Sequence, residues 1–124
     1  MATKDSKLGA ACPIPRWQLL KQELTNVGPE EFDRLRATAP PGTVLDVRAP
    51  AEFDAYHLAG ATNMNYLGAD FLERMEALDP GARYLVYCRS GRRSVRACTL
   101  MRNAGFTDLI HLEGGINAYE TTTE

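Results

Sequence analysis

Residues Tyr84 to Ser94 read YLVYCRSGRRS. The run from Tyr84 to Tyr87 is β-branched and aromatic, which predicts a buried strand. Val95, Cys98 and Met101 then follow at helical spacing, so the segment is expected to end in a helix. A loop that leads from the carboxyl end of a strand into a helix aims backbone N–H groups and the positive end of the helix dipole at one point. A thiol at that point should ionise more easily than a free thiol, so Cys88 is predicted to be a nucleophile in an anion-binding loop.

Charge around this loop differs from that of the chain as a whole. The net charge is −2, which argues against a nucleic-acid partner. No aspartate or glutamate occurs between Ala82 and Thr107, whereas four arginines crowd the loop and the helix that follows it: Arg89, Arg92, Arg93 and Arg96. This concentration of positive charge beside one cysteine favours a small anion as the ligand.

Composition limits the remaining classes of protein. A chain of 124 residues with 44% hydrophobic residues suits a single globular domain. No apolar run reaches the roughly 20 residues that a membrane helix needs, and Met1 to Gly9 lacks the apolar block of a secretory signal. Three cysteines without paired spacing suggest neither a disulfide framework nor a metal site. We therefore expect a cytoplasmic protein with no metal, no cofactor and no membrane partner.

Strands and helices are predicted to alternate along the chain. Short apolar runs predict strands at 23–27, 43–47, 61–64, 84–87 and 108–112. Helices are expected from Pro29, from Pro50, around 71–78, from the cysteine loop to a left-handed cap at Gly105, and from the Gly114-Gly115 pair. This alternation predicts an α/β fold with a parallel sheet covered on both faces, and in such folds the carboxyl ends of the strands carry the site. The domain should span 21–120, between an N-terminal arm at 1–20 and a polar tail at 121–124.

The expected arm has no core pattern, and its apolar residues are expected to hold it on the domain surface: Trp17, Leu19 and Leu20. It also contains the sequence Cys-Pro-Ile-Pro at 12–15, which resembles a motif of small sulfur-carrier proteins. Because prolines commonly bend such arms and the following sequence does not continue as in those proteins, we interpret this match as a coincidence.

The length of the cysteine loop bears on its substrate. Loops of the tyrosine-phosphatase type need a cysteine, five residues and then an arginine, which gives a ring wide enough for phosphate. Here the sixth residue after Cys88 is Ser94, and Arg93 comes one position early. Gly91 permits the tight curl that turns successive N–H groups inward. A narrower ring suits a sulfur atom better than a phosphoryl group, although Arg89 or Arg92 could still reach an oxyanion.

Four blocks of sequence together resemble the single-domain rhodaneses, which are thiosulfate sulfurtransferases. The resemblance covers roughly Leu24 to Glu120 and is carried by Asp46-Val47-Arg48 with Glu52-Phe53, by residues 57–63 (HLAGATN), by residues 88–94 (CRSGRRS) and by Gly114-Gly115-Ile116. It implies a three-layer domain with a mainly parallel five-stranded sheet. The chain departs from the usual pattern at Tyr56, where glycine is common, and at Tyr119, where tryptophan is usual.

The same resemblance implies a reaction. Cys88 would take the outer sulfur of thiosulfate or a related small anionic donor as a persulfide and pass it to cyanide or to a thiol acceptor, free or on a protein. The loop N–H groups would hold the persulfide and the arginines would orient the donor. The implied site is therefore catalytic Cys88 with the substrate-binding residues Arg89, Ser90, Gly91, Arg92, Arg93 and Ser94. A persulfide carrier or binding module is the alternative, and a phosphatase or arsenate reductase is disfavoured by loop length.

Other polar residues are expected to be structural. Cys98 lies on the apolar face of a helix and should be buried and inert. Asp46 is expected to support the loop with hydrogen bonds, and Arg48 and Glu52, four residues apart, to pair with each other. The two histidines, His57 and His111, are expected to be hydrogen-bonded turn or strand-end residues rather than bases.

Overall fold

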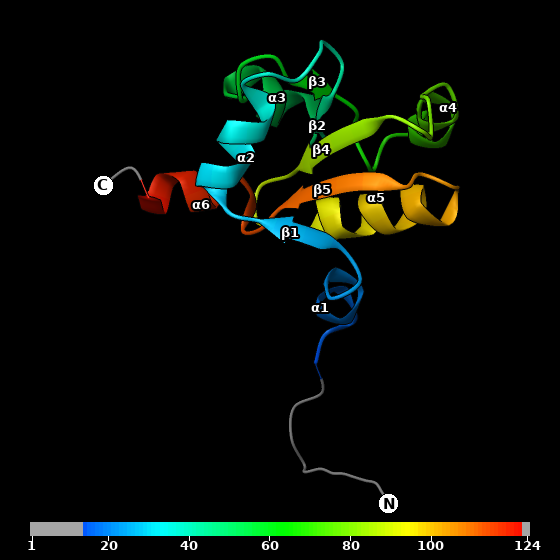
Figure 1. The fold of residues 1–124 in the computed structure, drawn as a ribbon, viewed down its shortest axis with the longest axis horizontal. Helices are drawn as coiled ribbons and strands as arrows, with labels where there is room; N and C mark the ends of the chain where they lie inside the picture. Colours follow the sequence, from blue (N-terminus) through cyan, green and yellow to red (C-terminus); the bar gives the residue numbers. More distant parts are fainter. Residues whose placement is uncertain (1–13, 123–124) are drawn as a thin grey trace, which may run out of the picture.

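The computed structural model describes residues 14–122, and Figure 1 shows their arrangement. The strands are β1 (Thr25–Val27), β2 (Val44–Asp46), β3 (Thr62–Asn63), β4 (Arg83–Tyr87) and β5 (Asp108–Leu112). The helices are α1 (Arg16–Lys21), α2 (Pro29–Arg36), α3 (Pro50–Ala55), α4 (Phe71–Glu76), α5 (Arg92–Asn103) and α6 (Gly115–Thr122). None of these helices has the length and apolar composition needed to cross a membrane.

The strands form one sheet in the order β1-β5-β4-β2-β3, and each neighbouring pair is parallel. The predicted α/β fold with a five-stranded parallel sheet is therefore confirmed. Strand β4 occupies the middle of the sheet and is buried from Tyr84 to Tyr87. Its carboxyl end, where Cys88 follows, lies at the centre of the edge at which ligands bind in such folds.

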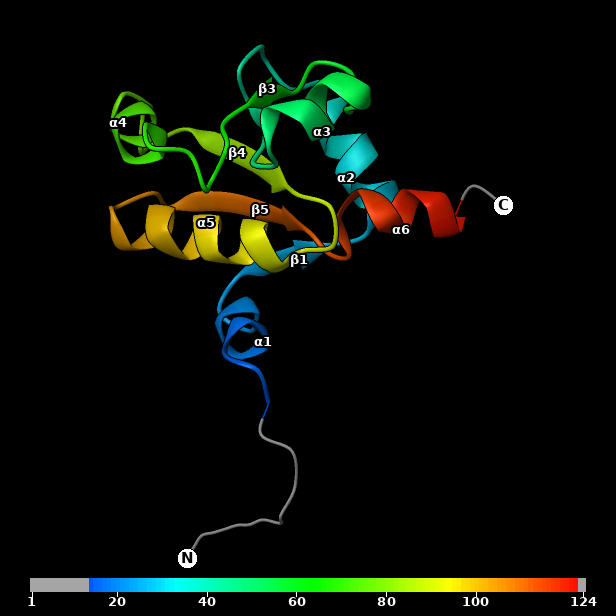
Figure 2. The same cartoon turned by 180° about the vertical axis from the view of Figure 1, so that it is seen from behind.

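Helices cover both faces of this sheet, as predicted. On one face, Met75 of α4 and Met101 of α5 pack with Val86 of β4. On the other face, Phe32 of α2 and Ile116 of α6 join the cluster of buried side chains. Figures 1 and 2 show α5 running alongside β5 in both views. The result is a three-layer domain whose two cores share β4.

Helix α5 ends as its sequence predicts. Gly105 adopts φ of 105°, the left-handed conformation that favours glycine after a helix. Phe106 is buried and its ring meets that of Tyr84 edge-on at 5.7 Å. The C-terminal end of α5 is therefore fixed by Gly105, and its N-terminal end follows the cysteine loop.

The structure adds helix α1, which the sequence did not predict, inside the expected arm. Trp17 and Leu20 are half-buried where α1 packs against α5, but Leu19 is 48% exposed, so its expected anchoring role was wrong. Lys21 and Arg92 both lie over the Trp17 ring, at 5.9 and 5.4 Å from its centroid. The Cys12-Pro13 half of the proline motif lies outside the described residues.

Candidate active site

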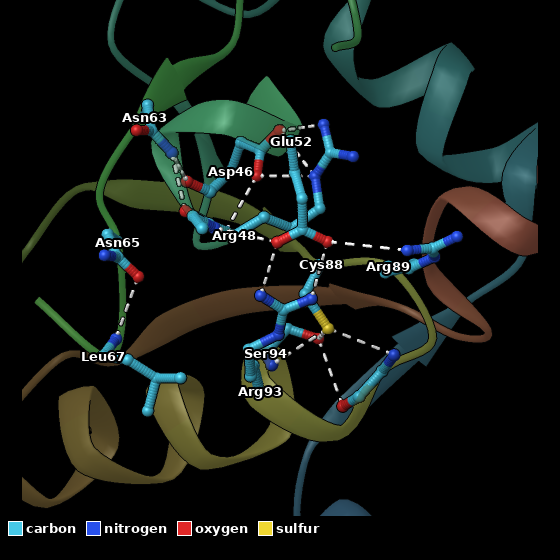
Figure 3. Close-up of polar contacts among 12 residues, drawn as sticks. Asp46, Arg48, Glu52, Asn63, Asn65, Leu67, Cys88, Arg89, Arg93 and Ser94 are labelled. Atoms are coloured by element: carbon cyan, nitrogen blue, oxygen red, sulfur yellow. Dashed lines mark hydrogen bonds and ion pairs between the residues drawn. The ribbon is translucent and has the colours of Figure 1, made fainter. Parts of the chain in front are cut away.

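Cys88 directly follows β4 and is only 1% exposed, and three groups that can donate hydrogen bonds lie around its sulfur. The backbone N–H groups of Gly91 and Ser94 approach Sγ at 3.1 and 3.3 Å, and Ser94 Oγ lies 3.2 Å away. Gly91 turns the chain into α5 with φ of 113°, which places the first N–H groups of the helix toward the sulfur. The predicted cradle of N–H groups around Cys88 is thus present in the geometry (Figure 3).

A second helix start holds the same loop from the opposite side. The N–H groups of Ile116 and Asn117, in the first turn of α6, bind the carbonyl oxygens of Cys88 and Arg89, each at 3.0 Å. Gly115 makes this approach possible: it has φ of 63°, and a Cβ there would lie 2.4 Å from the Arg89 oxygen. The Gly114-Gly115 pair therefore serves the cysteine loop, because α6 satisfies the loop carbonyls while α5 presents its N–H groups to the sulfur.

Ser94 connects the sulfur to a buried histidine. Its Oγ lies 2.7 Å from His111 Nε2, and His111 Nδ1 lies 2.8 Å from Asn26 Oδ1. His111 is 1% exposed, and burial, with a smaller effect of the Lys21 charge, lowers its pKa to about 4. The expectation that His111 is a hydrogen-bonded strand residue is confirmed.

His57 also matches its structural expectation and lies apart from these contacts. Its Nδ1 is 2.8 Å from the Phe53 carbonyl oxygen, and the two rings stack at 3.7 Å between centroids. Cys98 is fully buried, and burial raises the pKa of its thiol well above the ordinary range. Neither side chain is placed for chemistry at Cys88.

The arginines of the loop are less available to bind an anion than the sequence suggests, because they contact other side chains. Arg93 binds Glu52 through both terminal nitrogens at 2.7 and 3.1 Å, and Arg89 lies 4.0 Å from the same carboxylate (Figure 3). The hydrogen bond to Arg93 is the main reason that the pKa of Glu52 falls to about 2. Arg92 is exposed but lies over Trp17, and Ser90 is exposed. Arg89, with 66% of its side chain exposed, is the arginine best placed to meet an incoming anion.

The predicted pair between Arg48 and Glu52 is wrong. Arg48 instead binds Asp46, with Nη2 to Oδ2 at 2.7 Å and both residues buried, and it also donates to the Tyr56 carbonyl oxygen. Spacing by four residues brings side chains together only within a helix. Arg48 precedes α3, so its side chain turns back to the strand end while Glu52 faces the loop.

The family model described as a rhodanese-like domain matches residues 28–122. The chain belongs to this family. The thiosulfate sulfurtransferase GlpE of Pseudomonas entomophila is 32% identical over 101 residues, which cover 81% of this chain and 88% of that protein. The probable adenylyltransferase/sulfurtransferase MoeZ of Mycobacterium tuberculosis is 36% identical over 76 residues, or 61% of this chain. This chain spans only 19% of the length of that longer relative.

A solved structure agrees with this assignment. The rhodanese-like domain of the Anabaena protein Alr3790 aligns with a TM-score of 0.65 at 28% identity, over 77% of this chain and 73% of that one. Family membership and the sulfurtransferase names of the relatives support sulfur transfer as the general activity of this rhodanese-like domain.

The contacts that link His111 and Asn26 to Cys88 through Ser94 were not predicted from the sequence. Asn26 and His111 are direct partners across the β1–β5 ladder, so both side chains point to the face on which α5 begins. The alternation of side chains along each strand was available as a signal. It could not be used without the strand order, which places β5 beside β4 in this rhodanese-like domain.

Proposed function

We propose that this protein is a thiosulfate sulfurtransferase that works through a persulfide on Cys88. The observation that carries the proposal is the set of three donors around one buried sulfur: the N–H groups of Gly91 and Ser94 and the Ser94 hydroxyl group. These donors stabilise a thiolate without a directly bound base. The name of the relative GlpE, a thiosulfate sulfurtransferase that aligns over most of both chains, supports the same donor.

The reaction has two sulfur-transfer steps. The Cys88 thiolate attacks the outer sulfur of thiosulfate, a new S–S bond forms on Cys88, and the old S–S bond breaks as sulfite leaves with its electron pair. Cyanide or a thiolate acceptor then attacks the outer sulfur of the persulfide, and Cys88 leaves as a thiolate. Both steps exchange one S–S or S–C bond for another, so no external oxidant or reductant is needed.

Donor binding is the role that we propose for the exposed positive charge. Arg89 stands at the rim of the loop with its guanidinium group free enough to meet a dianion. Glu52 binds Arg93 and so fixes the position of its guanidinium group beside the cysteine loop. There the guanidinium group also attracts the anionic donor. Backbone N–H groups that curl around one sulfur atom favour sulfane sulfur over a phosphoryl group as cargo.

Mass spectrometry tests the first step directly. Incubation with thiosulfate, followed by intact-mass measurement, should show the gain of one sulfur atom, mapped to Cys88 by peptide analysis. Cyanide should then release thiocyanate with repeated turnover. Cys88→Ser should abolish both signals, whereas Cys98→Ala, a variant of the inert buried thiol, should keep them. An unmodified Cys88 after incubation with thiosulfate and with polysulfide would refute the proposal, and a single transfer without turnover would favour a persulfide carrier.

A further inference from the structure

A continuous series of hydrogen bonds runs from the sulfur of Cys88 to the strand at the edge of the sheet. Its steps are Cys88 Sγ to Ser94 Oγ at 3.2 Å, Ser94 Oγ to His111 Nε2 at 2.7 Å, and His111 Nδ1 to Asn26 Oδ1 at 2.8 Å. Cys88, Ser94 and His111 are each no more than 1% exposed. The series therefore links the nucleophile to an imidazole that bulk water does not reach.

The direction of these hydrogen bonds is fixed at the Asn26 end. The Asn26 side-chain nitrogen donates to the carbonyl oxygens of Lys21 and Leu24, at 3.0 and 3.2 Å. Carbonyl oxygens only accept, so the amide oxygen of Asn26 is the atom that faces His111. An amide oxygen also only accepts, and it follows that His111 carries a hydrogen on Nδ1.

The hydrogen on Nδ1 determines which hydrogen bonds the Ser94 hydroxyl group donates and accepts. In the neutral imidazole only one ring nitrogen carries hydrogen, so Nε2 of His111 is an acceptor. The lowered pKa of His111, about 4, keeps the ring neutral near pH 7 while Cys88 is a thiol. Ser94 Oγ lies 2.7 Å from Nε2 and 3.2 Å from the Gly91 carbonyl oxygen, and it donates its single hydrogen to the nearer acceptor, Nε2. Its oxygen is then left as an acceptor for the thiol of Cys88.

We propose that Ser94 and His111 form a proton relay for Cys88, in which His111 receives the proton that the thiol gives up and Asn26 is the positioning residue that makes Nε2 available. This inference rests on the part of the proposed function that makes Cys88 the nucleophile. It assigns a role to His111 and Asn26 beyond that of structural hydrogen bonding.

The transfer balances without any other reactant. The S–H bond of Cys88 breaks, its electron pair stays on sulfur, and its proton moves to Ser94 Oγ. The original hydroxyl proton of Ser94 moves to His111 Nε2. After the transfer both hydrogen bonds are reversed: Nε2–H donates to Oγ, and the hydroxyl group donates to the thiolate as the third donor beside the N–H groups of Gly91 and Ser94.

Charges around the imidazole permit this exchange. The charge of Lys21, at the end of α1, lowers the pKa of His111, and the charge of Glu113, directly after β5, raises it. Because Lys21 and Glu113 bind each other at 2.9 Å, their opposite effects on the ring largely cancel. Strand β1 contributes the neutral Asn26, and Arg93 of α5 is bound to Glu52. The Cys88 sulfur is separated from the ring by one hydroxyl group, so formation of the thiolate raises the pKa of His111.

The pH dependence of Cys88 alkylation is the first test. In His111→Gln, the glutamine can still accept the Ser94 hydrogen bond but cannot take up a proton. We expect alkylation by iodoacetamide, measured at Cys88 by peptide mass, to become about tenfold slower at pH 6.5, as the profile moves up by about one pH unit. His57→Gln is the matched control and should leave the profile unchanged, because His57 contacts Phe53 and not the loop. An unchanged or downward-shifted profile in His111→Gln would overturn the relay.

A second measurement keeps the natural His111 and so does not depend on how its variant folds. In the His57→Gln background His111 is the one remaining histidine, and ¹⁵N NMR reports protonation of each ring nitrogen. We expect hydrogen on Nδ1 in the neutral ring and a titration midpoint at least about one pH unit higher with Cys88 present than in Cys88→Ala. Hydrogen on Nε2 in the neutral ring, or equal midpoints, would overturn the relay. Neither test uses a sulfur donor, so a Cys88 that is alkylated readily but never persulfidated would refute the proposed function alone.

Discussion

Gly115, the first residue of α6, packs against the backbone of the cysteine loop that leads into α5. Any side chain at this position would meet the carbonyl oxygens of Arg89 and Cys88 at 2.4 and 2.5 Å, and these are backbone atoms that cannot move without opening the loop. The residue thus couples the geometry around the sulfur to the last helix of the domain.

The Gly115→Ala variant should therefore lose both stability and sulfur transfer. The left-handed φ of 63° costs an alanine about 1 to 2 kcal/mol, and the backbone overlap adds to this. We expect a loss of at least about 2 kcal/mol in urea unfolding, with kcat/KM for thiosulfate reduced more than about tenfold. Gly60→Ala is the control, because Gly60 has φ of 85° but no atom within 4 Å of the added Cβ. Equal effects in the two variants would contradict the role given to the overlap.

The stability that Glu52 contributes to the folded protein depends on pH. Its pKa in the folded protein, about 2, lies below the ordinary value of 4.5 because Arg93 binds the carboxylate. A lowered pKa means that the stability from this pair is complete above about pH 4.5 and is lost as the pH falls toward 2.

The Glu52→Gln variant should remove this acid-dependent contribution. Relative to wild type it should be less stable by roughly 1 to 3 kcal/mol at pH 7, and the difference should shrink as the pH approaches 2. Urea unfolding at several pH values measures the trend. Asp54→Asn, an exposed change on the same helix, should alter stability little at any pH. A difference between Glu52→Gln and wild type that does not depend on pH would contradict the assignment.

At the scale of elements, the connection from β2 to α3 is held by a buried ion pair. Asp46 and Arg48 have side chains 0% and 6% exposed, and Asp46 also accepts the Arg48 N–H group at 2.9 Å. Removing one charge from such a pair leaves the other buried without compensation.

Asp46→Asn should accordingly cost about 3 to 5 kcal/mol of unfolding free energy, measured by urea denaturation. The matched control is Asp108→Asn, which breaks the exposed pair between Asp108 and Arg83 at 3.0 Å and should cost no more than about 1 kcal/mol. Costs of similar size in the two variants would show that burial does not govern the Asp46 pair.

The elements that the sequence predicts well are those with a local signal. The strands near 44–46 and 83–87 follow from apolar runs, and the end of α5 follows from Gly105. Helix α1 has six residues and no buried side chain, so its sequence carries little periodic signal and its stability comes from packing against α5. The position of Cys88 could be predicted because a strand, a glycine and a helix start are consecutive in the chain. The contact of His111 with Ser94 could not, because it depends on the order of strands.

At the scale of the whole domain, the core on the face of the sheet that α4 and α5 cover keeps Cys98 away from solvent. Cys98 is 0% exposed on α5, within the same cluster as Val86 and Met101. A thiol in this position reacts only when the domain opens.

Alkylation of Cys98 should therefore report global unfolding. In a Cys12→Ser/Cys88→Ser variant Cys98 is the remaining thiol, and we expect its reaction with iodoacetamide to be at least about a thousandfold slower than in urea-unfolded chain. The rate should rise with urea in parallel with the loss of circular dichroism. Rapid alkylation before any loss of signal would mean that α5 detaches while the rest of the domain stays folded.

The contacts of α6 with the cysteine loop have a consequence for synthesis of the protein. The carbonyl oxygens of Cys88 and Arg89 are bound by N–H groups of residues 116 and 117, which the ribosome adds almost thirty residues after the cysteine. A growing chain that has reached Cys88, or even the end of α5, lacks both of these donors. During translation, the loop around the nucleophile can therefore close only after residues 116 and 117 have been added and have left the exit tunnel.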